Sequence, residues 1–158
     1  MNKLTLAICV YNAARYIQET LQSVMAQTMQ NFHLLIINDC STDRSEEVVK
    51  QFLTEHPRPY ELISFEKNQG IANARNFALN HINTEFLLFI DSDDLLYPTL
   101  VEEEYLTITS DKDLIGVSCW SQFINEKGEK VYEFTSGSSY EKGETAVTRI
   151  LPGCGVKK

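Results

Sequence analysis

Short, continuous apolar runs alternate along the chain with segments in which apolar residues recur every three or four positions. The apolar runs are residues 4–10, 32–37, 60–65 and 86–90. The segments with helical spacing are residues 17–25, 48–53 and 71–82. Runs of this length are typical of buried strands, and the recurring spacing is typical of amphipathic helices. Strands that alternate with helices in this way predict an α/β fold with a mostly parallel sheet flanked by helices.

The regular alternation ends after Asp94. The later elements that we expect are a short helix from Pro98 to Glu104, a hairpin of residues 114–124 and 131–134, a weak helix over residues 140–150 and the start of a strand at residues 153–156. The segment Asn125-Glu126-Lys127-Gly128 supplies turn residues between the two hairpin segments. A C-terminal antiparallel hairpin is therefore predicted beside the parallel sheet.

The composition is that of an ordered globular protein. Of the 158 residues, 43% are hydrophobic and 23% charged, and neither a repeat nor a linker interrupts them, so we expect one domain over residues 1–158. The formal net charge of −8 disfavours nucleic acids and anionic membranes as partners, since both are bound through Lys and Arg. No apolar stretch approaches the roughly 20 residues of a membrane span. We expect a cytoplasmic protein, with any membrane attachment made by regions outside this chain.

The cysteines indicate neither a zinc site nor a disulfide framework. They are Cys9, Cys40, Cys119 and Cys154, with no CxxC pair among them and no histidine at zinc-ligand spacing. We expect them to be mostly reduced thiols, as is usual in the cytosol.

Three carboxylates follow the last of the four apolar runs. Residues 86–90 lead directly into Asp91, Ser92, Asp93 and Asp94, so the acidic residues come where a buried strand leaves the sheet. Open α/β sheets bind their ligands at that carboxyl edge. Clustered carboxylates repel one another, and hard cations such as Mg²⁺ or Mn²⁺ take oxygen ligands together with substrate phosphates. The segment therefore predicts a site for a divalent metal and a diphosphate.

Polar residues also follow the first two predicted strands. Tyr11 and Asn12 come after the first strand, and Asn38 and Asp39 after the second. Because parallel strands end at one edge of the sheet, these residues should meet the acidic segment there. The candidates are Tyr11 as an aromatic face for a base, Asp39 as an acceptor for a ring N–H, Asp91 for ribose hydroxyls or a metal-bound water, Asp93 as a metal ligand, and Arg75 as a partner for phosphate or for the acidic cluster.

Four motifs, taken together, make the sequence recognisable. They are Cys9-Val10-Tyr11-Asn12, Asn38-Asp39-Cys40-Ser41-Thr42-Asp43, Asn68-x-Gly70-x-x-x-Ala74-Arg75-Asn76 and Asp91-Ser92-Asp93-Asp94. In this order they resemble the family 2 glycosyltransferases, which have the Rossmann-like GT-A fold, over roughly the first two-thirds of the chain. A DxD pattern alone is a weak signal, whereas four motifs at this spacing are a specific one.

The resemblance implies transfer of a sugar from a nucleotide-diphospho-sugar, very often a UDP-sugar, to an acceptor hydroxyl with inversion. It also implies a divalent metal, Mn²⁺ or Mg²⁺, and a glycan or lipid-linked acceptor, as in the synthesis of surface polysaccharides or glycolipids. Carried over residue by residue, it places Val10 and Tyr11 at the base, Asp39 on the pyrimidine ring, Asp91 on the ribose, Asp93 on the metal and Arg75 near the diphosphate.

The sequence also departs from the family pattern. Cys9 stands where Pro is usual, Cys40 where Gly is usual and Asn38 where Asp is common. The general base of the family is an Asp or Glu well beyond the DxD motif, and we expect this chain to be truncated before it. The remaining acidic candidates are Glu102, Glu103, Glu104 and Glu141, none of which follows the family pattern. The general base is therefore not identified.

Other functions are open at this point. One is a donor-binding module that has lost its acceptor half and is catalytically incomplete. Another is a phosphatase with Asp91 as nucleophile and Asp93 as acid, although Leu95 stands where that class has Thr or Val. A nucleotidyltransferase is disfavoured because no Gly-rich, basic loop follows the first strand, and a dinucleotide-binding dehydrogenase because no GxGxxG does.

Overall fold

The computed structural model describes residues 3–125, 129–134 and 148–157. The chain forms two compact units, Met1–Gln22 with Gln30–Asp93 and Ser23–Met29 with Asp94–Lys158. Each unit carries a four-stranded sheet. The single domain that we expect over residues 1–158 stays a prediction.

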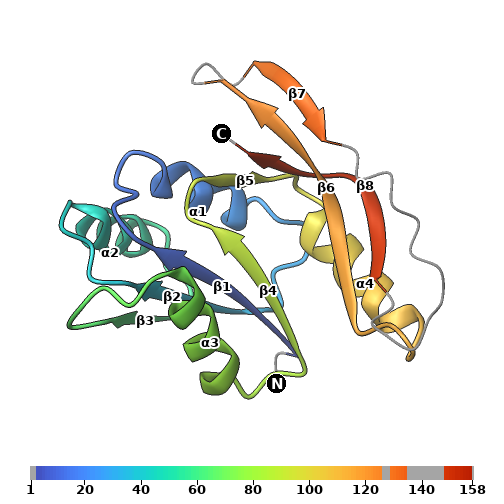
Figure 1. The fold of residues 1–158 in the computed structure, drawn as a ribbon, viewed down its shortest axis with the longest axis horizontal. Helices are drawn as coiled ribbons and strands as arrows, with labels where there is room; N and C mark the ends of the chain where they lie inside the picture. Colours follow the sequence, from blue (N-terminus) through green and yellow to red (C-terminus); the bar gives the residue numbers. More distant parts are fainter. Residues whose placement is uncertain (1–2, 126–128, 135–147, 158) are drawn as a thin grey trace. The chain divides into compact units, whose positions relative to one another are not determined.

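The first unit confirms the α/β fold. Its elements are β1 (Leu4–Val10), α1 (Ile17–Met25), β2 (His33–Asn38), α2 (Ser45–Glu55), β3 (Tyr60–Ser64), α3 (Ile71–His81) and β4 (Phe86–Asp91), with the end of α1 counted in the second unit. The strands lie in the order β3-β2-β1-β4, and all neighbours are parallel (Figure 1). Strands and helices alternate as the apolar pattern predicts.

The pairing register brings the strand ends together. Val10 pairs with Asn38 and Cys9 pairs with Asp91, so β1, β2 and β4 all finish at one edge of the sheet. Parallel strands cannot do otherwise when their registers match, because all of them run in the same direction. The loops that follow these strands therefore emerge side by side.

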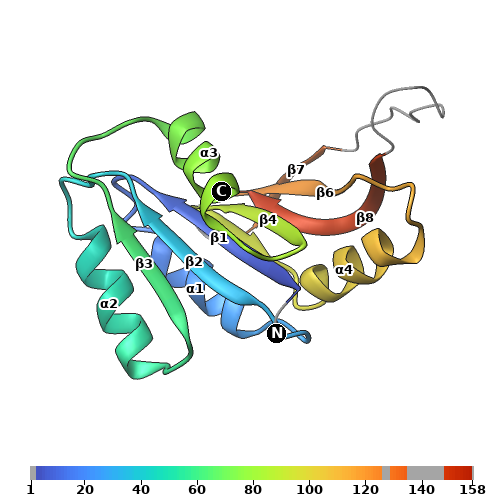
Figure 2. The ribbon, with the colours of Figure 1, turned by 90° about the horizontal axis from the view of Figure 1, so that it is seen from below.

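The two faces of this sheet are covered by different helices. Figures 1 and 2 show α1 and α2 on one face and α3 on the other. The cluster beneath α3 consists of Ala7, Cys9, Leu35, Ile37, Ala74 and Ala78. Ala74 and Ala78 of α3 are fully buried, and their small side chains let the helix approach the central strands closely. Burial of each large apolar side chain contributes about 1.5–3 kcal/mol.

The structure corrects one expectation about β4. We predicted a strand buried on both faces, but only Ile90 is buried, and the other apolar residues of β4 are partly exposed. In contrast, every residue of β1 is buried. The difference follows from position, because β1 is central in its sheet and β4 is the last strand. An apolar run therefore does not distinguish a central strand from an end strand.

The second unit contains the predicted hairpin. Its elements are β5 (Asp94–Leu96), α4 (Leu100–Ser110), β6 (Gly116–Ile124), β7 (Lys130–Phe134) and β8 (Thr148–Lys157). The antiparallel pairing of β6 with β7 confirms the hairpin, and the strand order is β5-β8-β6-β7. The helix expected from Pro98 to Glu104 is observed from Leu100 to Ser110. Of the weak helix expected over residues 140–150, residues 140–147 lie outside the described part, and residues 148–150 belong to β8, so that expectation is wrong there.

A buried glutamine fixes the start of α4. Thr99 precedes the helix without a capping side-chain hydrogen bond. The Gln27 side-chain oxygen instead accepts the backbone N–H of Val101 at 3.0 Å, while its amide nitrogen donates to the Tyr97 carbonyl at 2.8 Å. This satisfies one of the helix donors that has no partner within the helix. The sequence does not reveal this cap, because Gln27 is distant along the chain.

Three further features concern the described cysteines, histidines and helices. Cys9, Cys40 and Cys119 form no disulfide. His33 and His81 both contact the carboxylate of Glu61, at 3.4 Å and 2.8 Å, but no three His, Cys, Asp or Glu residues of the described part are grouped to hold a metal. In that part of the chain, none of the helices has the length and apolar character that a membrane span requires.

Glu104 is a buried carboxyl on α4. It is 8% exposed, and burial raises its pKa from 4.5 to about 7, against a smaller lowering effect of the hydrogen bond with Cys119. Because the folded-state pKa lies above that of the unfolded chain, the folded protein binds more protons between these two values. The free energy of unfolding therefore decreases as pH rises from about 4.5 to about 7.

We predict that Glu104→Gln removes this part of the pH dependence. The shift corresponds to about 3 kcal/mol, so the variant should be more stable than the wild type at pH 8 by up to about that amount and close to it at pH 4.5. Urea unfolding at a series of pH values measures the effect. Glu103→Gln is the matched control, because it removes a carboxylate from the exposed side of the same helix. An unchanged slope in Glu104→Gln would contradict the prediction.

Candidate functional site

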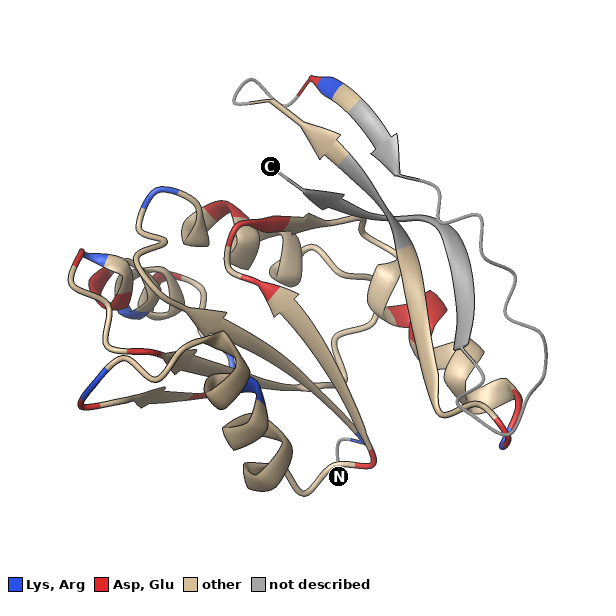
Figure 3. Cartoon of the chain, viewed as in Figure 1, with Lys and Arg blue, Asp and Glu red and all other residues tan. Residues whose placement is uncertain are grey.

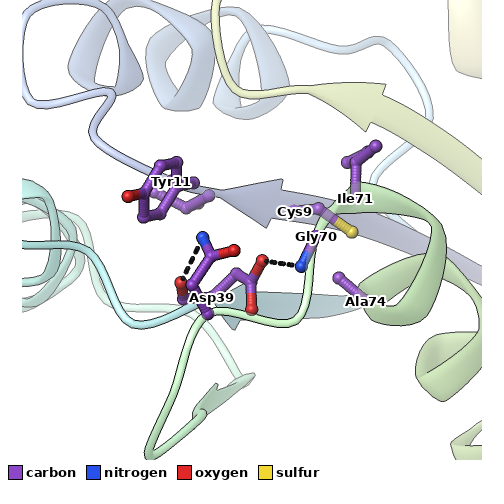
Figure 4. Close-up of a pocket in the computed structure, with 8 residues that line it drawn as sticks. Cys9, Tyr11, Asp39, Gly70, Ile71 and Ala74 are labelled. Atoms are coloured by element: carbon purple, nitrogen blue, oxygen red, sulfur yellow. Dashed lines mark hydrogen bonds between the residues drawn. The ribbon is translucent and has the colours of Figure 1, made fainter.

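A pocket lies at the carboxyl edge of the parallel sheet, beside the start of α3. Its lining residues are Cys9, Val10, Tyr11, Asp39, Asn68, Gly70, Ile71 and Ala74, and its volume is about 200 Å³ (Figure 4). The pocket thus brings together three of the predicted binding residues, Val10, Tyr11 and Asp39. The lining is mainly apolar, with Asp39 as its carboxylate. A flat, partly polar ring fits such a lining.

Sequence reasoning missed part of this lining. The sequence places Ile71 and Ala74 in a segment of helical spacing and Asn68, Gly70 and Ala74 in a family motif, but it predicts a binding role for none of them. Yet Ile71 is exposed and faces the pocket, and Gly70 precedes α3 with a φ of 83°, which an L side chain rarely adopts. A glycine at the entry of a helix was the available signal, since it marks a backbone with unusual geometry.

Asp39 is held by the backbone around it. It is 3% exposed, and its N–H donates to the Val10 carbonyl at 2.8 Å. Its two carboxylate oxygens accept the backbone N–H groups of Gln69 and Gly70, at 2.7 Å and 2.8 Å. Figure 4 shows the bond to Gly70. A carboxylate near the N-terminus of a helix is stabilised by the helix dipole. Its oxygens offer about four acceptor positions, so two remain for a ligand.

Cys9 faces the same pocket as a protonated thiol. Burial raises its pKa to about 11, the nearby Arg75 works against this, and Asp91 and Asp39 add to it. A thiol with such a pKa is not ionised at neutral pH and behaves as a small apolar group. Cys9 therefore extends the apolar wall of the pocket rather than supplying a nucleophile.

Arg75 and Asp91 form an ion pair across the edge of the sheet. The guanidinium Nη2 of Arg75 lies 2.6 Å from Oδ1 of Asp91, and the guanidinium also lies over the ring of Phe89 at 5.5 Å. Both charged side chains are more than a third exposed, so the pair contributes little to stability. It does fix the direction of both side chains toward the edge of the sheet.

Asp93 occupies the turn that follows β4. Figure 3 shows acidic residues at the carboxyl end of β4, where Asp91 and Asp93 stand in the sequence. Asp93 is exposed, and within the described part of the chain its carboxylate makes no hydrogen bond or ion pair. Because Mg²⁺ and Mn²⁺ commonly bind one or two carboxylates plus phosphate oxygens, Asp93 fits such a role only together with a phosphate ligand.

Asn38 and Cys40 both depart from the family pattern. The hydrogen bonds of Asn38 give a reason for its presence, whereas the backbone at Cys40 would suit glycine better. The side-chain amide of Asn38 donates to Glu46 at 2.7 Å, and its oxygen accepts the N–H of Ser41 at 3.1 Å. An Asp at this position would place a second carboxylate against Glu46. Cys40 has a φ of 58°, in the left-handed region that favours glycine, and is therefore strained.

The comparisons with known proteins agree with the fold. Residues 5–153 match the family model described as Glycosyl transferase family 2. Because this match covers most of the chain, the chain belongs to glycosyltransferase family 2. The resemblance inferred from the four motifs is therefore confirmed.

Two curated relatives illustrate the range of this family. The chain is 40% identical over 96 residues to a teichoic acid poly(glycerol phosphate) polymerase of Staphylococcus epidermidis, covering 61% of this chain and 13% of the relative. It is 33% identical to the glycosyltransferase GlyA of Streptococcus pneumoniae, covering 89% of this chain and 20% of the relative. The chain thus spans a minor part of the length of both relatives.

Solved structures show the same architecture. The chain resembles S. aureus TarS 1-349 in complex with UDP with a TM-score of 0.69 and 27% identity, over 80% of this chain and 38% of that one. It resembles the Pyrobaculum calidifontis mannosyltransferase PcManGT in complex with GDP-Man and Mn²⁺ with a TM-score of 0.68 and 25% identity, over 74% and 35%. The predicted GT-A fold is confirmed.

We predict that the left-handed backbone at Cys40 makes glycine better than alanine there. Both Cys40→Gly and Cys40→Ala lose the contact of Sγ with the Glu66 carbonyl, but only alanine keeps the strain of a positive φ. Cys40→Gly should therefore be more stable than Cys40→Ala by about 1 kcal/mol in urea unfolding. The same pair of substitutions at Gln51, an exposed position inside α2, is the control and should give the opposite order. Equal stabilities at position 40 would refute the argument.

Proposed function

We propose that this chain binds a nucleotide-diphospho-sugar, with a UDP-sugar as the favoured donor, and that the protein transfers the sugar to an acceptor hydroxyl with inversion. The observation that carries the proposal is the pocket at the carboxyl edge, where a buried Asp39 lies in an otherwise mainly apolar lining. The family assignment supports sugar transfer, and the UDP-bound TarS supports the choice of nucleotide.

The base belongs in the pocket. Tyr11 is 50% exposed and offers an aromatic face at the rim, and Val10 contributes an apolar edge. Uracil carries a donor at N3–H, and the acceptor positions of Asp39 that the Gln69 and Gly70 N–H groups leave open can receive it. Cytosine presents an acceptor at the same ring position, so a carboxylate that only accepts discriminates against it.

The sugar-phosphate part of the donor lies toward β4 in this proposal. Asp91 accepts from the ribose hydroxyls, and Arg75, which uses Nη2 for Asp91, has further donors for a phosphate oxygen. Asp93 ligates a divalent cation, Mn²⁺ or Mg²⁺, jointly with the diphosphate. Such a cation, when bound, supplies neutralisation of the charge that grows on the departing diphosphate.

The acceptor side of the proposal rests on the relatives alone. The teichoic acid poly(glycerol phosphate) polymerase of S. epidermidis supports a role in polysaccharide synthesis. We propose a glycan or lipid-linked acceptor and a cytoplasmic site of action. No residue of this chain is assigned as the general base that takes the acceptor proton. A donor-binding module without catalysis is therefore the alternative.

The phosphatase alternative has little support. Asp91 would have to attack a phosphoryl group, yet its Oδ1 is bound to the guanidinium of Arg75 at 2.6 Å. The family assignment is also against it. UDP binding distinguishes a transferase or its donor-binding module from a phosphatase, which has no need of a nucleotide. A transfer assay with a UDP-sugar then separates the transferase from the module.

We predict that UDP binds in a Mn²⁺-dependent manner and that Asp93→Asn abolishes this dependence. In isothermal calorimetry, Asp93→Asn should weaken the binding of UDP at least about tenfold when Mn²⁺ is present. It should leave the affinity for UDP unchanged when Mn²⁺ is absent. Asp113→Asn is the control, since it removes an exposed carboxylate from the second unit. If Asp93→Asn binds UDP as the wild type does in Mn²⁺, Asp93 is not a metal ligand.

We predict that Asp39 sets the preference for uracil. Asp39→Asn replaces an acceptor by a group that can also donate to cytosine N3, so the ratio of UDP to CDP affinity should fall about tenfold. The ratio itself is the internal control, because losses common to both nucleotides cancel. Thermal unfolding checks that the Gln69–Gly70 turn still forms. A folded variant that keeps the wild-type ratio would show that Asp39 does not contact the base.

A further inference from the structure

Asn12 lies between the pocket and a network of hydrogen bonds that joins two loops. It directly follows Tyr11 in the loop after β1. Its side-chain oxygen accepts the backbone N–H of Thr42 at 2.8 Å, the Thr42 hydroxyl at 3.2 Å and the N–H of Asp43 at 3.3 Å. Its own N–H donates to the Ser41 hydroxyl at 3.1 Å. A single side chain therefore connects the loop after β1 to the loop after β2.

Side chains of the loop after β2 also accept hydrogen bonds from the backbone of the loop after β1. Asp43 accepts the N–H of Ala14 at 3.0 Å, and the hydroxyl of Ser45 accepts the N–H of Ala13 at 2.8 Å. Asp43 also accepts the N–H of Ser45 at 2.9 Å and its hydroxyl. Burial works to raise the pKa of Asp43, but the hydrogen bonds from Ser45 and Ala14 outweigh it and hold the pKa below its usual range. We call this set, Asn12 to Ala14 with Ser41 to Ser45, the loop brace.

The loop brace fixes the backbone on one side of Tyr11, and the sheet fixes it on the other. The carbonyl of Val10 accepts the N–H of Asp39 at 2.8 Å, so the residue before Tyr11 is held as well. The Tyr11 ring itself is half exposed and makes no hydrogen bond within the described residues. The backbone at Tyr11 is therefore held on both sides, and no hydrogen bond of the ring within the described residues fixes its direction.

Asn12 is suited to this place for two separable reasons. Its φ is 50°, which Asn, Asp and Gly tolerate better than other residues. Its side chain also supplies the acceptor for three donors. Asn12→Gly keeps the first property and loses the second, whereas Asn12→Asp keeps both, because a carboxylate accepts the same donors.

We propose that Asn12 is a positioning residue for the donor base, and that it acts through Tyr11 by means of the loop brace. This inference rests on the proposed function, since it requires a nucleotide base on the Tyr11 ring. Asn12 does not touch the base in this account. Its contribution is to restrict the ring of Tyr11 to directions in which stacking costs little further ordering.

The test is a double-mutant cycle on UDP affinity, measured by calorimetry. Tyr11→Ala should weaken the binding of UDP about tenfold, because the base loses its stacking partner. Asn12→Gly should weaken it about fivefold in the wild type, but by less than about twofold in the Tyr11→Ala background, because coupled residues are not additive. Asn12→Asp should stay within about twofold of the wild type in affinity.

The possible results distinguish a positioning role of Asn12 from a structural one, and both from failure of the proposed function. Additive effects of Asn12→Gly and Tyr11→Ala, or an Asn12→Gly variant that loses stability in urea but keeps its UDP affinity, would mean a structural role only and overturn the inference. A wild type that does not bind UDP, with or without Mn²⁺, overturns the proposed function and the inference with it. If Asn12→Gly does not fold, Ser41→Ala, which removes one acceptor of the brace, takes its place. Its expected loss is about threefold and should likewise fall below about twofold in the Tyr11→Ala background.

Discussion

The register between β1 and its two neighbours is the constraint on which the site depends. With Val10 opposite Asn38 and Cys9 opposite Asp91, the three strands leave the sheet at the same level. A shift of one residue would turn every side chain of β1 to the other face, and the small Ala7 and Cys9 would no longer pack against the alanines of α3. The apolar packing of the sheet thus decides where Tyr11, Asp39 and Asp91 are placed, although none of these three belongs to the core cluster.

The sequence predicted the sheet well, because the information for it is local. Continuous apolar runs and helical stripes indicated every strand and helix of the first unit, and the direction of parallel strands implied that Asp39 and Asp91 would share an edge. Contacts between residues that are distant along the chain could not be predicted from the sequence. Gln27 caps α4 from a distant segment, and Asn68 and Ile71 line the pocket only because Asp39 draws the Gln69–Gly70 turn toward β2. Such contacts depend on the folded geometry and produce no periodic pattern in the sequence.

Asp39 has one observed task and one proposed task, and the two make opposite demands. As the acceptor for the Gln69 and Gly70 N–H groups it holds the entry of α3 in place, which favours complete burial. As the proposed contact for a base, it would also have to keep acceptor positions open to the pocket. A carboxylate can meet both demands, since its two oxygens accept from several directions, whereas an amide would lose one acceptor and a hydroxyl would be too short. Holding the turn and contacting a base together therefore restrict the residue at position 39 more than either requirement would alone.

The charges at this edge bear on what else must bind there. Asp39, Asp91 and Asp93 are carboxylates, while the guanidinium of Arg75 is already turned toward Asp91. A nucleoside diphosphate adds further negative charge, and unscreened charges of like sign a few ångströms apart cost several kcal/mol in a partly buried site. Backbone N–H groups do not offset this here, because those of Gln69 and Gly70 are used by Asp39. The free donors of Arg75 can reach a phosphate oxygen, but its single charge is shared with Asp91. A diphosphate on this edge would therefore need an added cation, and the exposed carboxylate of Asp93 is suited to hold it.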